Sequence, residues 1–81
     1  MTYNRSFPRI EKALELVENN NVIELQYGRS IVQSMGIPYY VNYTSETCIC
    51  YDNVNNGFKC KHIWAAQFQH QKTMEMKLND K

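Results

Sequence analysis

The sequence has little net charge, no long apolar run and no group of residues typical of an active site. Its 81 residues carry a formal charge of +1, so the chain lacks the overall positive charge of many nucleic-acid-binding proteins. No stretch approaches the roughly 18 apolar residues of a transmembrane helix, and the N-terminus lacks the apolar segment of a secretory signal. Nucleophile–base sets, glycine-rich phosphate loops and paired carboxylates are also missing. We therefore expect one non-enzymatic, intracellular domain over residues 1–81, with neither a membrane nor a small-molecule substrate as its partner.

The chain is also too short for its hydrophobic core alone to make it stable. Domains of this size bury about two-thirds of their unfolded surface or less, and many add a disulfide or a metal. The three cysteines are an odd number, and a disulfide within Cys48-Ile49-Cys50 would be strained and would close almost no loop. In a reducing compartment, clustered Cys and His residues more often bind metal. A metal is therefore favoured, and the alternative is that the cysteines are small apolar core residues.

The pattern of apolar residues predicts an α+β fold: an N-terminal helix, a short antiparallel β-meander, the metal site and a C-terminal helix. Apolar residues at helical spacing predict the first helix at 7–19. Three strands follow at 23–27, 30–34 and 39–44, with a Gly- and Pro-containing turn at 35–38, and their short connections favour antiparallel pairing. In the first strand, Ile23, Leu25 and Tyr27 alternate with polar residues, as in a half-buried strand. We expect an ordered core at about 7–71 and a frayed tail at 72–81.

The cysteines and one histidine form two closely spaced pairs. Cys48 and Cys50 in extended backbone would project their side chains to the same face, as two ligands of one tetrahedral metal require. Cys60 and His62 have the same spacing, so we place Cys60 just before the second helix and His62 in its first turn. The helix N–H groups, together with Lys59 and Lys61, would then stabilise a thiolate. Cys48, Cys50, Cys60 and His62 are the predicted ligands of one closed, structural Zn²⁺.

Two other side chains near the pairs have alternative interpretations. His70 could replace His62 as the fourth ligand, but it lies eight residues further along and is more simply a surface or half-buried histidine. Asp52 is better explained as a turn residue, or as a group that supports the ligands, than as a ligand itself. Trp64 and Phe68 lie four residues apart on one helix face, which is typical of core packing.

The ligand pattern resembles the SWIM-type zinc finger, in which C-x-C is followed, after a variable gap, by C-x-H. Here Cys48-Ile49-Cys50 is followed, after nine residues, by Cys60-Lys61-His62. Asp52, Gly57 and the segment "CKHIWAA" agree with the same pattern. Ala65, three positions after the histidine, matches the extended form C-x-H-x-x-A of the branch linked to recombination mediators. The resemblance covers about residues 10–70.

This resemblance implies a β-hairpin or short meander packed with a helix around zinc. Family members occur in transposase-related proteins, chromatin-remodelling ATPases, some kinases and recombination mediators, where the domain is associated with DNA binding or protein–protein interaction. The present chain has no room for an accompanying catalytic domain. What the resemblance implies here is therefore a stand-alone, non-enzymatic member of the family.

Two functions follow as expectations. The first is DNA binding through cations near the finger, for which the candidate contacts are Lys59, Lys61, Arg29 and Arg9; the alternative is that these cations are only solvated surface charge. The second is a protein-interaction adaptor or homodimer, because three thiolates and one Zn²⁺ together reduce the formal charge of +1 to zero while the aromatic content is high. A more distant third is a redox sensor that releases zinc on oxidation.

Overall fold

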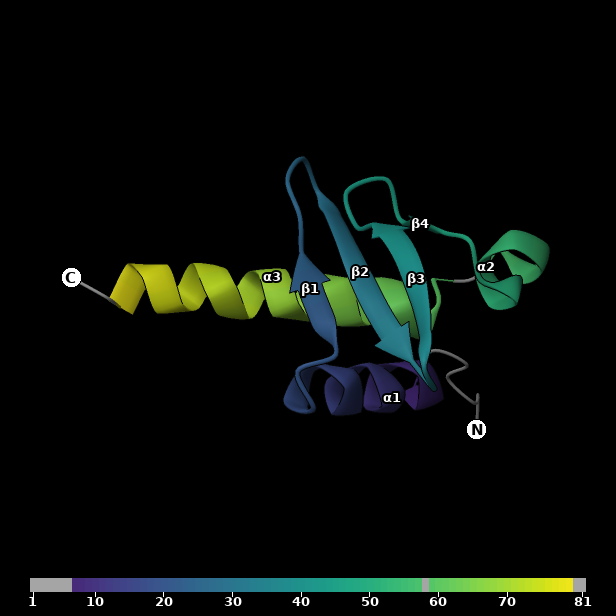
Figure 1. Ribbon diagram of the computed structural model, residues 1–81, viewed down its shortest axis with the longest axis horizontal. Helices are drawn as coiled ribbons and strands as arrows, with labels where there is room; N and C mark the ends of the chain where they lie inside the picture. Colours follow the sequence, from purple (N-terminus) through teal and green to yellow (C-terminus); the bar gives the residue numbers. More distant parts are fainter. Residues whose placement is uncertain (1–6, 58, 80–81) are drawn as a thin grey trace, which may run out of the picture.

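The computed structural model describes residues 7–57 and 59–79 and has the expected α+β fold. Four strands form one antiparallel meander in the order β1-β2-β3-β4, and three helices accompany it. Figure 1 shows α3 running behind the sheet and α1 along its lower end, with α2 to one side. In chain order the elements are α1 (Phe7–Glu18), β1 (Val22–Glu24), β2 (Arg29–Ser34), β3 (Ile37–Asn42), β4 (Thr47–Cys48), α2 (Tyr51–Asn56) and α3 (Lys61–Asn79).

The hairpin turns fix the register of the meander. Met35 and Gly36 form a two-residue turn with φ of 53° and 79°, the left-handed geometry that matches the natural twist of a hairpin. The expected turn at 35–38 is thus confined to its first half, and Pro38 lies in β3 opposite Gln33. A proline is tolerated there because β4 pairs with β3 only at Val41 and Asn42, which leaves the start of β3 at the edge of the sheet.

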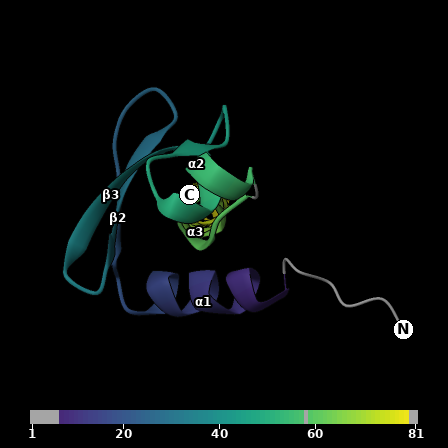
Figure 2. The ribbon, with the colours of Figure 1, turned by 90° about the vertical axis from the view of Figure 1, so that its right-hand side faces the viewer.

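The core lies between one face of the sheet and the two long helices. Figure 2 shows α3 end-on against the sheet, with α1 beneath both. The buried apolar residues of the two helices are mostly small: Ala13 and Val17 on α1, and Ile63, Ala65 and Ala66 on α3. The buried apolar residues are Ala13, Val17, Val32, Val41, Cys48, Cys50, Cys60, Ile63, Ala65 and Ala66.

The apolar pattern of the first strand predicted the wrong buried face. Ile23, Leu25 and Tyr27 are all exposed, whereas Val22 and Glu24 point toward α3. Glu24 can face inward because α3 supplies its partners: Thr73 Oγ1 donates to one carboxylate oxygen at 2.6 Å, and His70 Nδ1 lies 3.3 Å from the other. The outer face of the sheet is therefore more apolar than the sequence pattern indicated.

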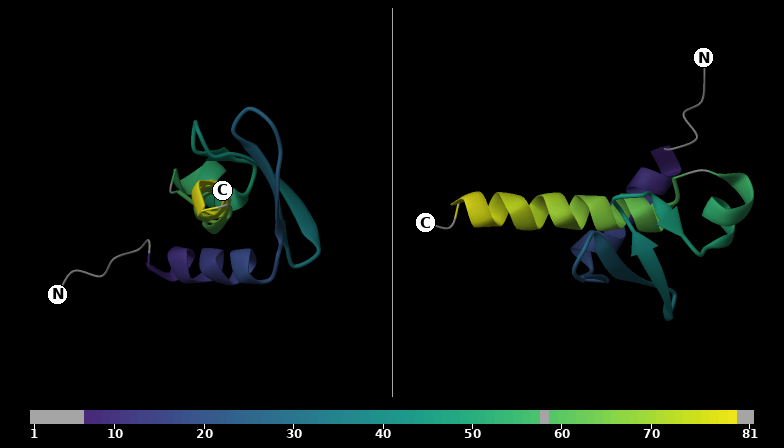
Figure 3. Two further views of the ribbon diagram at one scale, coloured as in Figure 1. Left: turned by 90° about the vertical axis from the view of Figure 1, so that its left-hand side faces the viewer. Right: turned by 90° about the horizontal axis from the view of Figure 1, so that it is seen from above.

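Two segments are more helical than expected. Residues 51–56, predicted as a turn-rich connection, form the short helix α2, which ends at Gly57 with φ of 69°. The second helix does not end near residue 71: α3 continues through Asn79, because no proline or glycine interrupts it and because Thr73 is bonded to Glu24 of β1. Figure 3 shows this end of α3 extending past the sheet, on the side away from α2.

Gly28 and Gly36 provide a matched test of the turn geometry. Both have positive φ, 75° and 79°, so alanine at either position is expected to cost about 1–2 kcal/mol of unfolding free energy. A Cβ at Gly36 meets no neighbour within 4 Å, whereas one at Gly28 would collide with the Thr44 side chain. Gly28→Ala should therefore destabilise the domain by about 1 kcal/mol or more beyond Gly36→Ala, as measured by urea unfolding with metal present. Adding Thr44→Ala should recover part of that excess, and equal losses for the two single variants would contradict the packing described here.

Candidate metal centre

The end of the sheet brings the first two thiols together. Cys48 is the last residue of β4 and pairs with Val41. Cys50 immediately precedes α2 in extended backbone, with φ of −72° and ψ of 159°. The turn after them is held by Asn53, whose side-chain oxygen accepts a hydrogen bond from the Cys48 N–H at 3.1 Å. As predicted from the spacing of two, both thiols point to the same side of the chain.

The start of α3 supplies the other two side chains. Cys60 immediately precedes the helix, and its carbonyl accepts the N–H of Trp64 at 3.1 Å, as a residue at a helix start does. His62 lies in the first turn, where its ring stacks on Tyr39 of β3 with the ring centres 4.0 Å apart. The placement of Cys60 before the helix and His62 within it is confirmed.

All four predicted ligands meet in one buried cluster. The ligand atoms of Cys48, Cys50, Cys60 and His62 all lie within 4.8 Å of one another, and Nδ1 of His62 is 3.8 Å from the Cys48 sulfur. Two atoms bound to one tetrahedral zinc are about 3.5–3.8 Å apart, so this pair already has the required spacing. The two ligand atoms that are furthest apart would need to move about 1 Å closer together to bind one zinc ion. This group could hold one metal ion.

The chemistry of the cluster also fits a metal. The three thiols are buried and form no disulfide. Three sulfurs and one imidazole nitrogen, all buried and close together, form a closed Cys₃His ligand set. Thiolates disfavour calcium and magnesium, which leaves zinc as the ion that this set fits best.

The three thiols differ in their readiness to ionise. Hydrogen bonds from the Cys48 thiol, from His62 and from the backbone N–H of Ile63 lower the pKa of Cys60 to about 4, although burial opposes this. A hydrogen bond to Cys60, together with burial, raises the pKa of Cys48, and burial is the main cause that raises the pKa of Cys50. A divalent cation would bind all three sulfurs as thiolates, in competition with protons, so its affinity falls as the pH is lowered.

Asp52 is not part of this cluster. Its carboxylate accepts two hydrogen bonds from the guanidinium of Arg9, at 2.6 Å and 2.8 Å, so the pair joins α1 to the start of α2. The hydrogen bonds that Arg9 donates to Asp52 are the main reason that the pKa of Arg9 is raised. Sequence reasoning placed Asp52 in a supporting role but did not anticipate Arg9 as its partner, because the two residues are 43 positions apart.

His70 is likewise separate from the metal centre. Its ring stacks on Tyr43 with the centres 4.9 Å apart, and its Nδ1 lies 3.2 Å from the Tyr43 hydroxyl and 3.3 Å from Glu24. Trp64 and Phe68, predicted to share a helix face, have their rings 5.7 Å apart and pack against the core. The sequence did not predict the contacts of His70 with Glu24 and Tyr43. No local pattern indicates them, because the three residues lie in distant parts of the chain.

The four cations predicted to contact a partner do not form one patch. Lys59 lies 3.3 Å from a carboxylate oxygen of Glu46, and its ammonium group is 3.7 Å from the centre of the Trp64 ring. Arg9 and Lys61 are brought together with Lys12 around a depression beside the metal centre. Arg29 lies instead on the outer face of the sheet, where its Nε donates to the carbonyl of Gln26 at 3.4 Å.

Comparison of the chain with protein-family models, with curated proteins and with solved structures gave no match. The likeness to SWIM-type zinc fingers therefore rests on the residues themselves and on their geometry. Among the described residues, 7–57 and 59–79, no helix combines the length and the apolar character needed to cross a bilayer.

The two histidines provide a matched test of the metal site. Purified protein should contain one zinc per chain by elemental analysis, and its Co²⁺-substituted form should show thiolate charge-transfer absorption. Loss of a supporting contact alone costs about 10–100-fold in metal affinity, so His62→Ala, which removes a ligand, should cost more than 100-fold. His70→Ala should keep the full metal content and lose only about 1 kcal/mol of stability. Equal metal content in the two variants would rule out His62 as a ligand.

Proposed function

We propose that this chain forms a zinc domain of SWIM type whose metal is structural and whose role is binding rather than catalysis. The Cys₃His set supports a structural metal because four protein ligands complete a tetrahedral site and leave no position for a substrate. All three thiols belong to this set, so none is left as a nucleophile. Reduced thiols that hold zinc also fit a reducing, intracellular compartment.

The function that the geometry supports best is protein interaction, and the observation that carries it is the outer face of the sheet. Ile23, Ile31 and Tyr40 are register partners across β1, β2 and β3, so their side chains form a continuous row. Tyr40 is 60% exposed and Ile23 is 49% exposed, and no helix among the described residues covers this side of the sheet (Figures 1 and 2). Together with Leu25 and Ile49, they form what we call the outer sheet face. Contiguous exposed apolar surface of this kind commonly marks an interaction site.

The electrostatics support the same proposal. With zinc bound the formal charge is zero, so counterion release from a nucleic acid would contribute little. Two of the four candidate contacts are already engaged by carboxylates, Arg9 by Asp52 and Lys59 by Glu46. A protein partner, either another protein or a second copy of this chain, fits an apolar, nearly uncharged surface better.

Selection from a random peptide display library on immobilised, zinc-loaded protein tests this function. Enriched peptides should bind the wild type and persist at 0.5 M salt, on the order of the concentration at which surface charges are largely screened. Tyr40→Ser and Ile23→Ser should each weaken binding about 5–10-fold, because truncating an exposed apolar anchor removes about 1–1.5 kcal/mol. The control is Tyr51→Ser, which removes an exposed tyrosine on α2, away from the outer sheet face. Peptides insensitive to Tyr40 and Ile23, or no enrichment at all, would exclude this surface.

A second candidate function, nucleic-acid binding, is favoured by the depression beside the metal centre. This depression, of about 530 Å³, is lined by Arg9, Lys12 and Lys61 together with Tyr39 and Tyr51. Cations interleaved with aromatic rings suit phosphates and unpaired bases. Against it, Arg9 is bound to Asp52, and Glu15 lies 3.9 Å from Lys12.

Titration of zinc-loaded protein with single- and double-stranded oligonucleotides at 50 mM and 200 mM salt tests this second function. If it operates, binding should weaken steeply with salt, and the double variant Lys12→Glu/Lys61→Glu should lower affinity by about tenfold or more. Arg29→Glu, on the outer sheet face, is the matched control for a charge reversal elsewhere. Equal loss in both variants would indicate an unspecific charge effect, and no binding at 50 mM salt would remove the candidate.

A further inference from the structure

We propose that the outer sheet face binds an extended segment of a partner protein in which two apolar residues flank an acidic one, in the pattern apolar-x-acidic-x-apolar. This inference rests on the proposed interaction function and names the partner chemistry for the same surface. It is carried by three features of the surface: its shape, its single charge and its width.

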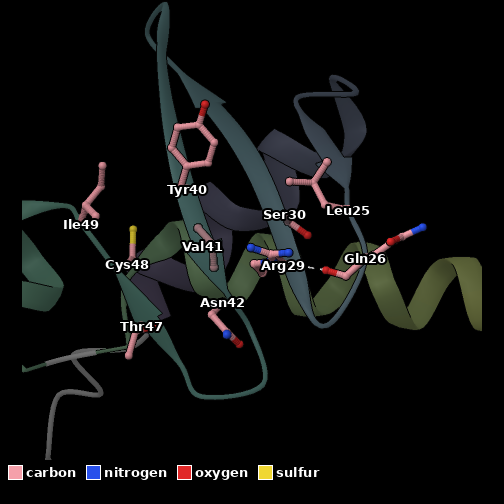
Figure 4. A pocket seen from close by; sticks show the side chains of 10 residues that line it. All are labelled: Leu25, Gln26, Arg29, Ser30, Tyr40, Val41, Asn42, Thr47, Cys48 and Ile49. Carbon is pink, nitrogen blue, oxygen red and sulfur yellow. Dashed lines mark hydrogen bonds between the residues drawn. The ribbon is translucent and has the colours of Figure 1, made fainter.

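The outer sheet face is hollowed into a groove of about 620 Å³, which is within the usual range for a binding site. Figure 4 shows Leu25 and Ile49 at opposite ends of this groove, with Tyr40 and Arg29 between them. Leu25, Tyr40 and Ile49 are 42%, 60% and 65% exposed, so their apolar atoms are available to a partner. Tyrosine and arginine are the side chains most often found at the energetic centre of a protein interface.

The charge of the groove specifies an anionic group. Arg29 is the only charged residue among those that line the groove, and the other lining residues are apolar or neutral. Within residues 7–57 and 59–79 the guanidinium has no ion pair, and its one hydrogen bond, to the Gln26 carbonyl, is long at 3.4 Å. A carboxylate can accept two parallel hydrogen bonds from a guanidinium, and this pairing is geometrically selective. The groove is therefore complementary to a carboxylate with apolar groups on either side.

The width of the groove specifies an extended segment. It crosses the sheet from the β1–β2 hairpin, which carries Leu25, to Ile49 just after β4. Four strands 4.7–4.9 Å apart span about 14 Å from the first to the last. In an extended peptide, residues i, i+2 and i+4 share one face and span about 13 Å, so a central carboxylate lies between two apolar anchors. In a helix the same five-residue pattern spans only about 6 Å, so it reaches both ends of the groove only in extended backbone.

Synthetic peptides test this specificity directly. The probe is a capped peptide with leucine at both apolar positions, serine at the spacers and glutamate at the centre, and its matched control carries glutamine at the centre. Binding to zinc-loaded, ¹⁵N-labelled protein should shift the amide signals of Leu25, Arg29, Tyr40 and Ile49. The glutamate peptide should bind about tenfold more tightly than the glutamine peptide, and Arg29→Gln should abolish that difference. Lys61→Gln, which removes a cation outside the groove, should leave the affinity difference between the two peptides unchanged.

The outcomes separate this inference from the function on which it rests. If peptides bind the outer sheet face and depend on Tyr40 but do not distinguish glutamate from glutamine, the carboxylate specificity is wrong while protein interaction stands. If the glutamate peptide shifts signals around Arg9 and Lys61 instead, the attraction is general and the groove is not the site. If neither synthetic peptide binds at millimolar concentration, the inference fails, and the display selection then decides separately whether the proposed function fails as well.

Discussion

Three sulfurs and one imidazole meet where β4, α2 and α3 come together, and an ion bound by them would join these elements. β4 contributes only two residues to the sheet, and α2 is a helix of six residues. Neither could be stable alone, because isolated helices of this length are marginal and so short a strand forms few hydrogen bonds. The ligands lie at the end of β4, before α2 and at the start of α3, so one ion at their centre would fix all three elements at once.

The candidate metal ligands are part of the hydrophobic core. Of the ten buried apolar residues in the described chain, three are the cysteines, and the rest are alanines, valines and one isoleucine. Such small side chains bury little apolar area each, so the core alone has limited stabilising power. The Arg9–Asp52 ion pair adds a link from α1 to α2, but it is partly exposed and so contributes modestly. A metal ion bound by the four ligands would therefore supply most of the constraint on this end of the molecule.

The sequence predicted the ligands and the fold class because both depend on local spacing. A separation of two in extended backbone, and a cysteine directly before a helix, place Cys48, Cys50, Cys60 and His62 together without knowledge of the rest of the chain. The face of β1 could not be predicted in this way, because the partners of Glu24 lie 46 and 49 positions away in α3. The same holds for Lys59, whose contacts with Glu46 and Trp64 depend on how α3 packs against the β3–β4 turn. Whether SWIM-type function accompanies this geometry remains a prediction.

The ligands are confined to residues 48–62, which bears on the order in which the molecule assembles. Closing so short a loop has a small entropic cost, whereas docking α1 on α3 and packing α3 against β1 bring distant segments together. An ion could therefore be captured while most of the chain is still unfolded. The metal-bound segment would then act as a template on which the meander and α1 fold, so that the chain acquires its architecture outward from residues 48–62.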